Sequence, residues 1–201
     1  DNNTVVVATS DGLVRCLDVR TDISMTRLTG FMSWCFCVEF SPDGSQLTVG
    51  SGDGTIRAYS VPGFRPLWTV HVVDSAHRTR GLAYTSDSKT LIAGSMDGAV
   101  RFINTETGEV EAMVRASPAE IYSLALNPAG TLIAVGSADA YIRLIDLKSK
   151  MPMLTLPRQE RRVEGLAFSP DGKTLVSSGL NNSVQVWDAS TWQPVYRLET
   201  T

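Results

Sequence analysis

The chain has 201 residues and a formal net charge of −3, with 43% hydrophobic and 19% charged residues. This composition suits a packed globular protein and excludes a disordered chain; the small negative charge gives no general attraction to phosphate backbones or anionic lipid. No apolar stretch approaches the roughly 18 residues that a membrane-spanning helix needs, so we expect no membrane partner.

Two sequence markers recur along the chain with the same period. Ten-residue segments of one pattern, such as SGDGTIRAYS and SMDGAVRFIN, follow one another at intervals of 42 or 44 residues, and they begin at Thr9, Ser51, Ser95, Ser137 and Gly179. An SPDG-like turn repeats in phase with them, at Ser41, Thr85, Asn127 and Ser169. Two independent markers that keep one period predict a repeat protein.

Each period contains four short strand signals. In the best example these are Ile121–Leu126, Thr131–Gly136, Tyr141–Asp146 and Met153–Leu156, which are rich in Ile, Leu, Val and aromatic residues. In chain order the periods cover residues 1–29 (partial), 30–73, 74–115, 116–157 and 158–201. The Asp-Gly pairs at 11–12, 53–54 and 97–98 predict tight hairpins, because glycine accepts the positive φ of such turns.

Four antiparallel strands per repeat are the unit of a β-propeller blade, so we predict an all-β fold. A single blade buries neither face, and blades must therefore stack around an axis. The first strand of each blade lies in the most crowded zone, which agrees with the small residues at equivalent positions in it: Cys37, Gly81, Ser123 and Gly165. Glu39 stands where the other repeats have alanine, and we expect it to face solvent along the axis.

The turn motifs give the chain a resemblance to the WD40-repeat family over its whole length. The closing Trp-Asp pair is complete only at Trp187-Asp188, and the Gly-His site, which reads Gly30-Phe31 in its first copy, keeps no histidine. The resemblance implies a WD40-type propeller with about four complete blades and one partial blade, part of a seven-bladed ring. It also implies that the family's His–Asp–Ser/Thr–Trp hydrogen-bond network is incomplete in every blade. We expect the chain to form an open arc, or a ring completed by further chain, and to be unstable or oligomeric in isolation.

The tips between the second and third strands carry acidic residues that we expect to accept backbone hydrogen bonds, namely Asp11, Asp53, Asp97 and Asp139. With no histidine nearby, Asp53→Ala is expected to cost about 1 kcal/mol, the scale of one net hydrogen bond. Arginines recur four residues later, at Arg15, Arg57, Arg101 and Arg143, with Gln185 in the fifth place. They either form a basic column or lie over apolar surface and pair with carboxylates.

No motif for catalysis is present. The sequence has no P-loop, no zinc or calcium pattern, and no nucleophile in a catalytic context, so we predict neither an enzyme nor a cofactor or metal, and no small-molecule substrate. The odd number of cysteines, with no framework spacing, favours a reducing compartment and an intracellular location, cytoplasmic or nuclear.

We therefore predict a scaffold that binds other proteins within a multiprotein complex. The Asp-Gly turns and the inter-blade connections fall on one face, whose surface positions hold interface-type residues: Phe31, Met32, Trp34, His77, Arg78, Met96, Arg161 and Arg162. Trp34 has an alternative role as a core residue at the start of its strand. The alternative function is recognition of nucleic acid or an anionic ligand by Arg78, Arg80, Arg158, Arg161 and Arg162, which the net charge disfavours.

Overall fold

The computed structural model describes residues 3–21, 23–72, 78–180 and 183–199, and in this part of the chain every regular element is a β-strand. The strands are β1 (Thr4–Ala8), β2 (Val14–Asp18), β3 (Ile23–Leu28), β4 (Cys35–Phe40), β5 (Gln46–Ser51), β6 (Thr55–Ser60), β7 (Pro66–His71), β8 (Thr79–Tyr84), β9 (Thr90–Ser95), β10 (Ala99–Asn104), β11 (Val110–Arg115), β12 (Ile121–Leu126), β13 (Leu132–Ser137), β14 (Ile142–Asp146), β15 (Met151–Thr155), β16 (Val163–Phe168), β17 (Thr174–Gly179), β18 (Ser183–Asp188) and β19 (Pro194–Glu199).

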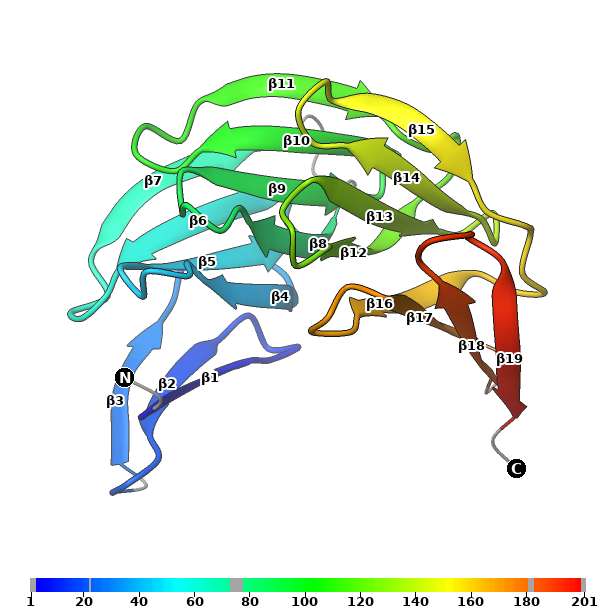
Figure 1. Cartoon of the computed structure of the whole chain (residues 1–201). Helices are drawn as coiled ribbons and strands as arrows, with labels where there is room; N and C mark the ends of the chain where they lie inside the picture. The colour runs from blue at the N-terminus through cyan, green and yellow to red at the C-terminus, as the bar shows by residue number, and fades with distance from the viewer. Residues whose placement is uncertain (1–2, 22, 73–77, 181–182, 200–201) are drawn as a thin grey trace.

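The strands form five antiparallel meanders that stand side by side in an arc (Figure 1). The first sheet has three strands, β1-β2-β3, and the others have four, as in β4-β5-β6-β7 and β12-β13-β14-β15. The first sheet lies at one end of the arc and the last sheet, β16-β17-β18-β19, at the other. The predicted all-β propeller of four complete blades and one partial blade is therefore confirmed.

The first strands of the complete blades lie next to one another along the axis of the arc. Strand β12 contacts both β8 and β16, and β4 contacts β8. Space there is so tight that a Cβ added to Gly81 of β8 would lie 2.9 Å from the Leu124 side chain of β12. The expectation of small residues near the axis is thus explained by direct sheet-to-sheet contact, while Glu39 is exposed, as predicted.

The hydrophobic core lies between blades. One cluster, for example, joins Ile56 and Val70 of the second sheet to Leu91 and Ile103 of the third, all of them buried. Each inner sheet therefore contributes apolar side chains to two neighbours, and this shared burial stabilises the arc. Among the residues that the structure describes, no helix has the length and apolarity to span a bilayer.

Backbone hydrogen bonds tie the tight turns to the inter-blade connections. The carbonyl of Gly54 accepts from the N–H of Val72 at 2.8 Å, and the carbonyl of Gly98 accepts from Ala116 and Ser117 at 3.0 Å. Turns and connections thus share one end of the sheets, as the up-and-down topology predicts. We call this end the turn face; the SPDG-like turns lie on the opposite face.

Candidate functional site

The turn face presents several of the predicted interface residues to solvent. Met32 is 91% exposed and Trp34 is 56% exposed, and Arg78 and Arg161 are also exposed. Trp34 is therefore a surface residue rather than a core residue. Met96 and Arg162 are half-buried, and His77 lies outside the described residues.

Phe31 has a different place from the one that the sequence predicted. It is buried in the core between the first two sheets, 9% exposed, with its ring 6.5 Å from that of Tyr59. The guanidinium of Arg57 lies 4.8 Å from the centre of the Phe31 ring. Phe31 therefore supports the loop that carries Met32 and does not present its own ring to a partner; its assignment as a surface residue is corrected by this packing.

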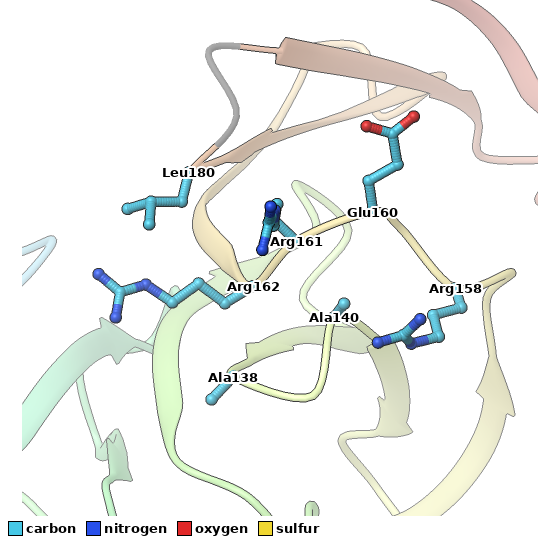
Figure 2. A pocket seen from close by; sticks show the side chains of 7 residues that line it. All are labelled: Ala138, Ala140, Arg158, Glu160, Arg161, Arg162 and Leu180. Carbon is cyan, nitrogen blue, oxygen red and sulfur yellow. The ribbon is translucent and has the colours of Figure 1, made fainter.

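A shallow hollow lies on the turn face at the border of the fourth and fifth sheets (Figure 2). Its volume is about 280 Å³, and its lining includes Arg158, Glu160, Arg161, Arg162 and Leu180. The Leu180 side chain is 58% exposed at the rim. Figure 2 shows the Arg162 side chain extending away from Arg158 and Glu160, so the three arginines do not converge on one point.

The turn aspartates pair with the recurring arginines on the strand that follows each turn. The closest N–O distances are 3.6 Å for Arg15–Asp11, 3.9 Å for Arg57–Asp53 and 2.6 Å for Arg143–Asp139, and Arg101 and Asp97 form a pair as well. The arginines are thus neutralised one by one and form no free basic column. The second of the two predicted roles, pairing with a carboxylate, is the one that the structure shows.

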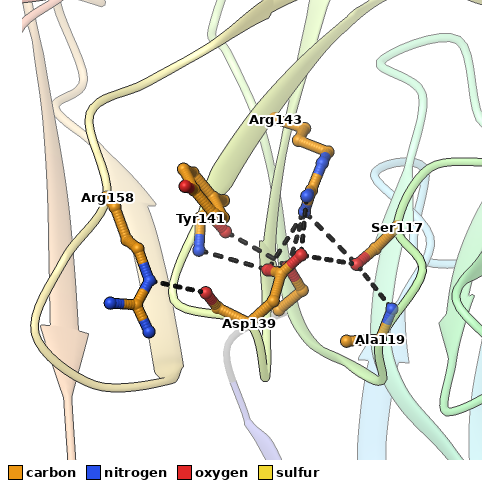
Figure 3. Close-up of polar contacts among 7 residues, drawn as sticks. Ser117, Ala119, Asp139, Tyr141, Arg143 and Arg158 are labelled. Atoms are coloured by element: carbon orange, nitrogen blue, oxygen red, sulfur yellow. Dashed lines mark hydrogen bonds and ion pairs between the residues drawn. The ribbon is translucent and has the colours of Figure 1, made fainter.

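The pair in the fourth sheet is the centre of a network (Figure 3). Arg143 donates to Asp139 through Nη1 at 3.1 Å and Nη2 at 2.6 Å, and Nη1 also donates to Ser117 Oγ at 3.2 Å. The backbone N–H of Tyr141 donates to Asp139 Oδ1 at 3.2 Å, and the hydroxyl of Ser137 donates to the same oxygen at 2.5 Å. Because Ser117 belongs to the inter-blade connection, this network fixes a loop of the turn face to its strands.

Asp53 has the same function in the second sheet. Its Oδ1 accepts from the N–H and the hydroxyl of Thr55 at 2.9 and 2.6 Å, and its Oδ2 accepts from the N–H of Met32 at 2.9 Å. The predicted acceptance of backbone hydrogen bonds is confirmed. The hydrogen bond from Met32 is not a local turn contact, because it joins the turn to the exposed loop and holds that loop in place.

Both carboxyls have pKa values below the ordinary range. Burial raises the pKa of Asp139, but hydrogen bonds from Arg143, Ser137 and the Tyr141 N–H outweigh it, so the pKa is lowered. The pKa of Asp53 is lowered in the same way, against partial burial, by bonds from Thr55 and Met32. The two groups are therefore ionised at neutral pH and retain their acceptor function.

A β-bulge at the start of each axial strand turns one extra residue toward the turn face. Between the paired residues of β4 and β5 the extra residue is Phe36, and the equivalent bulges in the next three sheets contain Arg80, Tyr122 and Glu164. A bulge leaves its extra residue unpaired and re-aims its side chain. Four neighbouring sheets thus each contribute one side chain near the axis.

These bulge residues form a stack with Arg162. The guanidinium of Arg80 lies 4.5 Å from the centre of the Phe36 ring and 4.7 Å from that of Tyr122, and Arg162 lies 4.7 Å from Tyr122 on its other side. Arg162 also pairs with Glu164. We call the sequence Phe36–Arg80–Tyr122–Arg162 the axial ladder. Cation–π contacts of this kind hold the guanidinium planes against the ring faces.

The thiols offer no reactive group. Burial raises the pKa of Cys16 to about 11 and the pKa values of Cys35 and Cys37 to about 12, so all three are protonated at neutral pH. Within the described ranges no group of three His, Cys, Asp or Glu side chains is arranged to hold a metal ion.

Comparison with known families accounts for the repeats. The family described as "WD domain, G-beta repeat" matches residues 24–60, 67–104, 109–146 and 150–188. The chain belongs to the WD40 repeat family. Each matched WD40 segment begins in or near the last strand of one sheet and ends with the third strand of the next, as 24–60 does from β3 to β6. The sequence repeat therefore links neighbouring blades.

Curated WD40 relatives are similar at low identity and are longer than this chain. Apoptotic protease-activating factor 1 of Danio rerio is 26% identical over 93% of the chain and 14% of its own length. Periodic tryptophan protein 2 of Arabidopsis thaliana is 24% identical over 99% of the chain and 22% of its own length. THO complex subunit 3 of Arabidopsis thaliana is 26% identical over 96% of the chain and 60% of its own length. The chain thus spans less than two thirds of each of these relatives.

The last sheet retains part of the WD40 hydrogen-bond network. Trp187 of the Trp-Asp pair donates through Nε1 to Ser177 Oγ at 2.9 Å, and that hydroxyl donates to Gln159 Oε1 at 3.2 Å. Gln159 occupies the place of the family histidine, and the turn residues 181–182 lie outside the described residues. In the fourth sheet Arg143 donates to Ser137 on the neighbouring strand at 2.9 Å and to Asp139 at the turn, and in the first three sheets an arginine pairs with the turn aspartate in the same way.

Sequence reasoning missed Phe36 and Tyr122 of the axial ladder and the stacking that joins them to Arg80 and Arg162. The bulge residues stand one position before the small axial residues Cys37, Gly81, Ser123 and Gly165, so the repeat alignment already contained the signal. Arg80 entered the prediction only as one of several loop arginines, because a bulge cannot be recognised from alternation of polar and apolar residues alone.

Proposed function

We propose that the chain is a non-catalytic platform for protein–protein interaction and that the turn face is its working surface. The observation that carries this proposal is the exposure of Met32 and Trp34 on a loop that is fixed from beneath by Asp53 and Phe31. Large apolar side chains held rigidly at a surface bind a partner without a large entropic cost. The opposite face presents the SPDG-like turns, which are built chiefly from Pro, Asp, Gly, Asn and Ser.

The proposal extends to assembly and compartment. A similar WD40 protein is named as a subunit of a complex, THO complex subunit 3. We propose that this chain likewise works within a multiprotein complex, and that it does so inside the cell, in the cytoplasm or nucleus. The free thiols of Cys16, Cys35 and Cys37 support a reducing compartment.

Matched surface variants test the choice of face. Met32→Ala, Trp34→Ala and Arg161→Ala, made in the intact protein, are expected to reduce the recovery of its co-purifying partners, measured by quantitative mass spectrometry. Lys89→Ala and Lys173→Ala on the opposite face serve as controls, because both lysines are exposed. Melting temperatures of all variants are measured to exclude unfolding. Loss of partners only in the lysine variants would place the working surface on the opposite face.

A second function, recognition of nucleic acid or another phosphate-bearing ligand, draws support from the hollow lined by Arg158, Arg161 and Arg162. A salt titration separates it from protein binding. Phosphate contacts lose affinity by several decades between low and moderate salt, whereas binding through apolar side chains changes little.

A further inference from the structure

Two cations at one end of the axial ladder lack a carboxylate partner. Among the residues that the structure describes, neither Arg78 nor Arg80 takes part in an ion pair, and the buried Nε of Arg80 has no acceptor. Arg80 is held instead by the Phe36 and Tyr122 rings, whose centres lie 4.5 and 4.7 Å from its guanidinium. A guanidinium that contacts aromatic rings binds an anion through its edge, where its N–H groups point.

The other end of the ladder is electrically balanced. Arg162 pairs with Glu164 and donates through Nη1 to the Tyr122 hydroxyl at 3.2 Å, and this hydroxyl donates to Glu120 at 2.9 Å. Among the described residues of the ladder, the positive charge without a carboxylate partner is therefore that of Arg80, and Arg78 lies beside it on the Phe36 ring.

A hollow walled by two aromatic rings adjoins these cations. It has a volume of about 200 Å³ and is lined by Ser33, Trp34, Phe36 and Arg78. The rings of Trp34 and Phe36 lie 5.9 Å apart, and the guanidinium of Arg78 is 5.5 Å from the centre of the Phe36 ring. Aromatic walls beside a positively charged group favour a peptide in which an apolar residue stands next to an acidic residue.

We propose that the axial ladder binds an acidic segment of a partner protein, with one Asp or Glu carboxylate on the edge of Arg80 and a neighbouring apolar side chain in the hollow beside Trp34. This rests on the proposed function and specifies the chemistry of the partner. A planar carboxylate matches the fork of a guanidinium in two parallel hydrogen bonds, which gives both energy and orientation.

Charge complementarity favours an acidic peptide over a nucleic acid. Glu120 and Glu164 border the ladder, and the chain as a whole has a net charge of −3. A nucleic acid strand has a phosphate at every nucleotide, and some of these phosphates would be repelled by Glu120 and Glu164. A single carboxylate can instead contact Arg78 and Arg80 alone.

Fluorescence anisotropy with defined probes tests this inference on the full chain. The probes are a labelled peptide of alternating glutamate and leucine, its glutamine–leucine counterpart, and labelled oligodeoxythymidine. We expect the glutamate peptide to bind best and Arg80→Gln to weaken it by about 10- to 100-fold, the effect of one charged hydrogen-bonding group. Arg80→Lys should give an intermediate affinity, because it keeps the charge and loses the fork. Lys89→Gln and Lys173→Gln on the opposite face should leave the affinity unchanged.

Three results would overturn the inference: equal binding of the glutamine peptide, unchanged affinity of Arg80→Gln, or preference for oligodeoxythymidine. If Arg80→Gln lowers the melting temperature, Arg78→Gln is used in its place, because Arg78 is exposed. Unchanged peptide affinity of Arg78→Gln would then count against the inference. The partner-recovery experiment with the Met32, Trp34 and Arg161 variants tests the platform function independently of the peptide probes. If those variants lose partners but the glutamate peptide does not bind, the platform function stands and only the acidic-segment proposal fails.

Discussion

Replacement of Asp139 by alanine tests the idea that Asp–Arg pairs take over the stabilising function of the missing histidines. The change removes both oxygens that Arg143 contacts and the acceptor for Ser137 and the Tyr141 N–H. Breaking a fully buried ion pair costs 3–5 kcal/mol, and the Arg143 and Asp139 side chains are 16% and 21% exposed. After a discount for this partial solvent access, we expect the free energy of unfolding to fall by about 2–3 kcal/mol.

Urea denaturation of Asp139→Ala, Arg143→Ala and the double variant measures this effect. The double-mutant cycle should give a coupling energy of about 1–2 kcal/mol, since the two side chains share one network. Asp11→Ala is the matched control, because its pair with Arg15 is longer and more exposed, and it should give the smallest loss of the series. Equal losses for Asp11→Ala and Asp139→Ala, or a coupling below about 0.5 kcal/mol, would refute the reasoning.

Further predictions concern the turns and the last sheet. Asp53→Ala should lower the free energy of unfolding by about 2 kcal/mol in urea denaturation, because Asp53 accepts from Met32 and from both donors of Thr55. This is more than the loss of about 1 kcal/mol expected from the sequence for one hydrogen bond. A loss of about 1 kcal/mol or less would show that the loop contact adds nothing. Gly98→Ala should lower the melting temperature more than Gly44→Ala does: both have positive φ, but a Cβ at Gly98 would lie 2.2 Å from the Ser117 carbonyl oxygen, and one at Gly44 meets nothing within 4 Å. Similar melting temperatures would contradict this clash. Lowered pKa values at Asp53 and Asp139 mean that their stabilisation is complete above about pH 4 and decreases as the pH falls toward the folded-state pKa values; thermal melts should show this decrease, and Asp139→Asn should reduce it. Trp187→Phe should cost about 1 kcal/mol by removing the bond to Ser177, and an unchanged urea midpoint would show that this bond contributes nothing.

The sequence predicted the fold because two kinds of signal agreed. Asp-Gly turns and SPDG-like turns fix where each strand ends, and antiparallel topology then assigns each turn to one face. Topology also placed Met32 and Trp34 at the end of the sheets that carries the Asp-Gly turns, but it left open whether Trp34 is exposed or buried. Local chain geometry was therefore sufficient for the blades.

Contacts between sheets could not be read in the same way. Phe31 stands at a loop position, and its burial depends on Tyr59 and Arg57, which both lie on β6, more than 25 residues further along the chain. The stack of Phe36, Arg80 and Tyr122 depends on bulges that re-aim one residue per sheet. Such contacts arise only when blades pack together, so residue type and spacing do not reveal them.

Site-specific photo-crosslinking from the two faces of the intact protein tests the central claim most directly. A photoreactive amino acid replaces Trp34 on the turn face or Lys173 on the opposite face, and crosslinked partners are identified by mass spectrometry. We expect partner adducts from position 34 and few from position 173. Adducts from position 173 alone would contradict the turn face as the working surface.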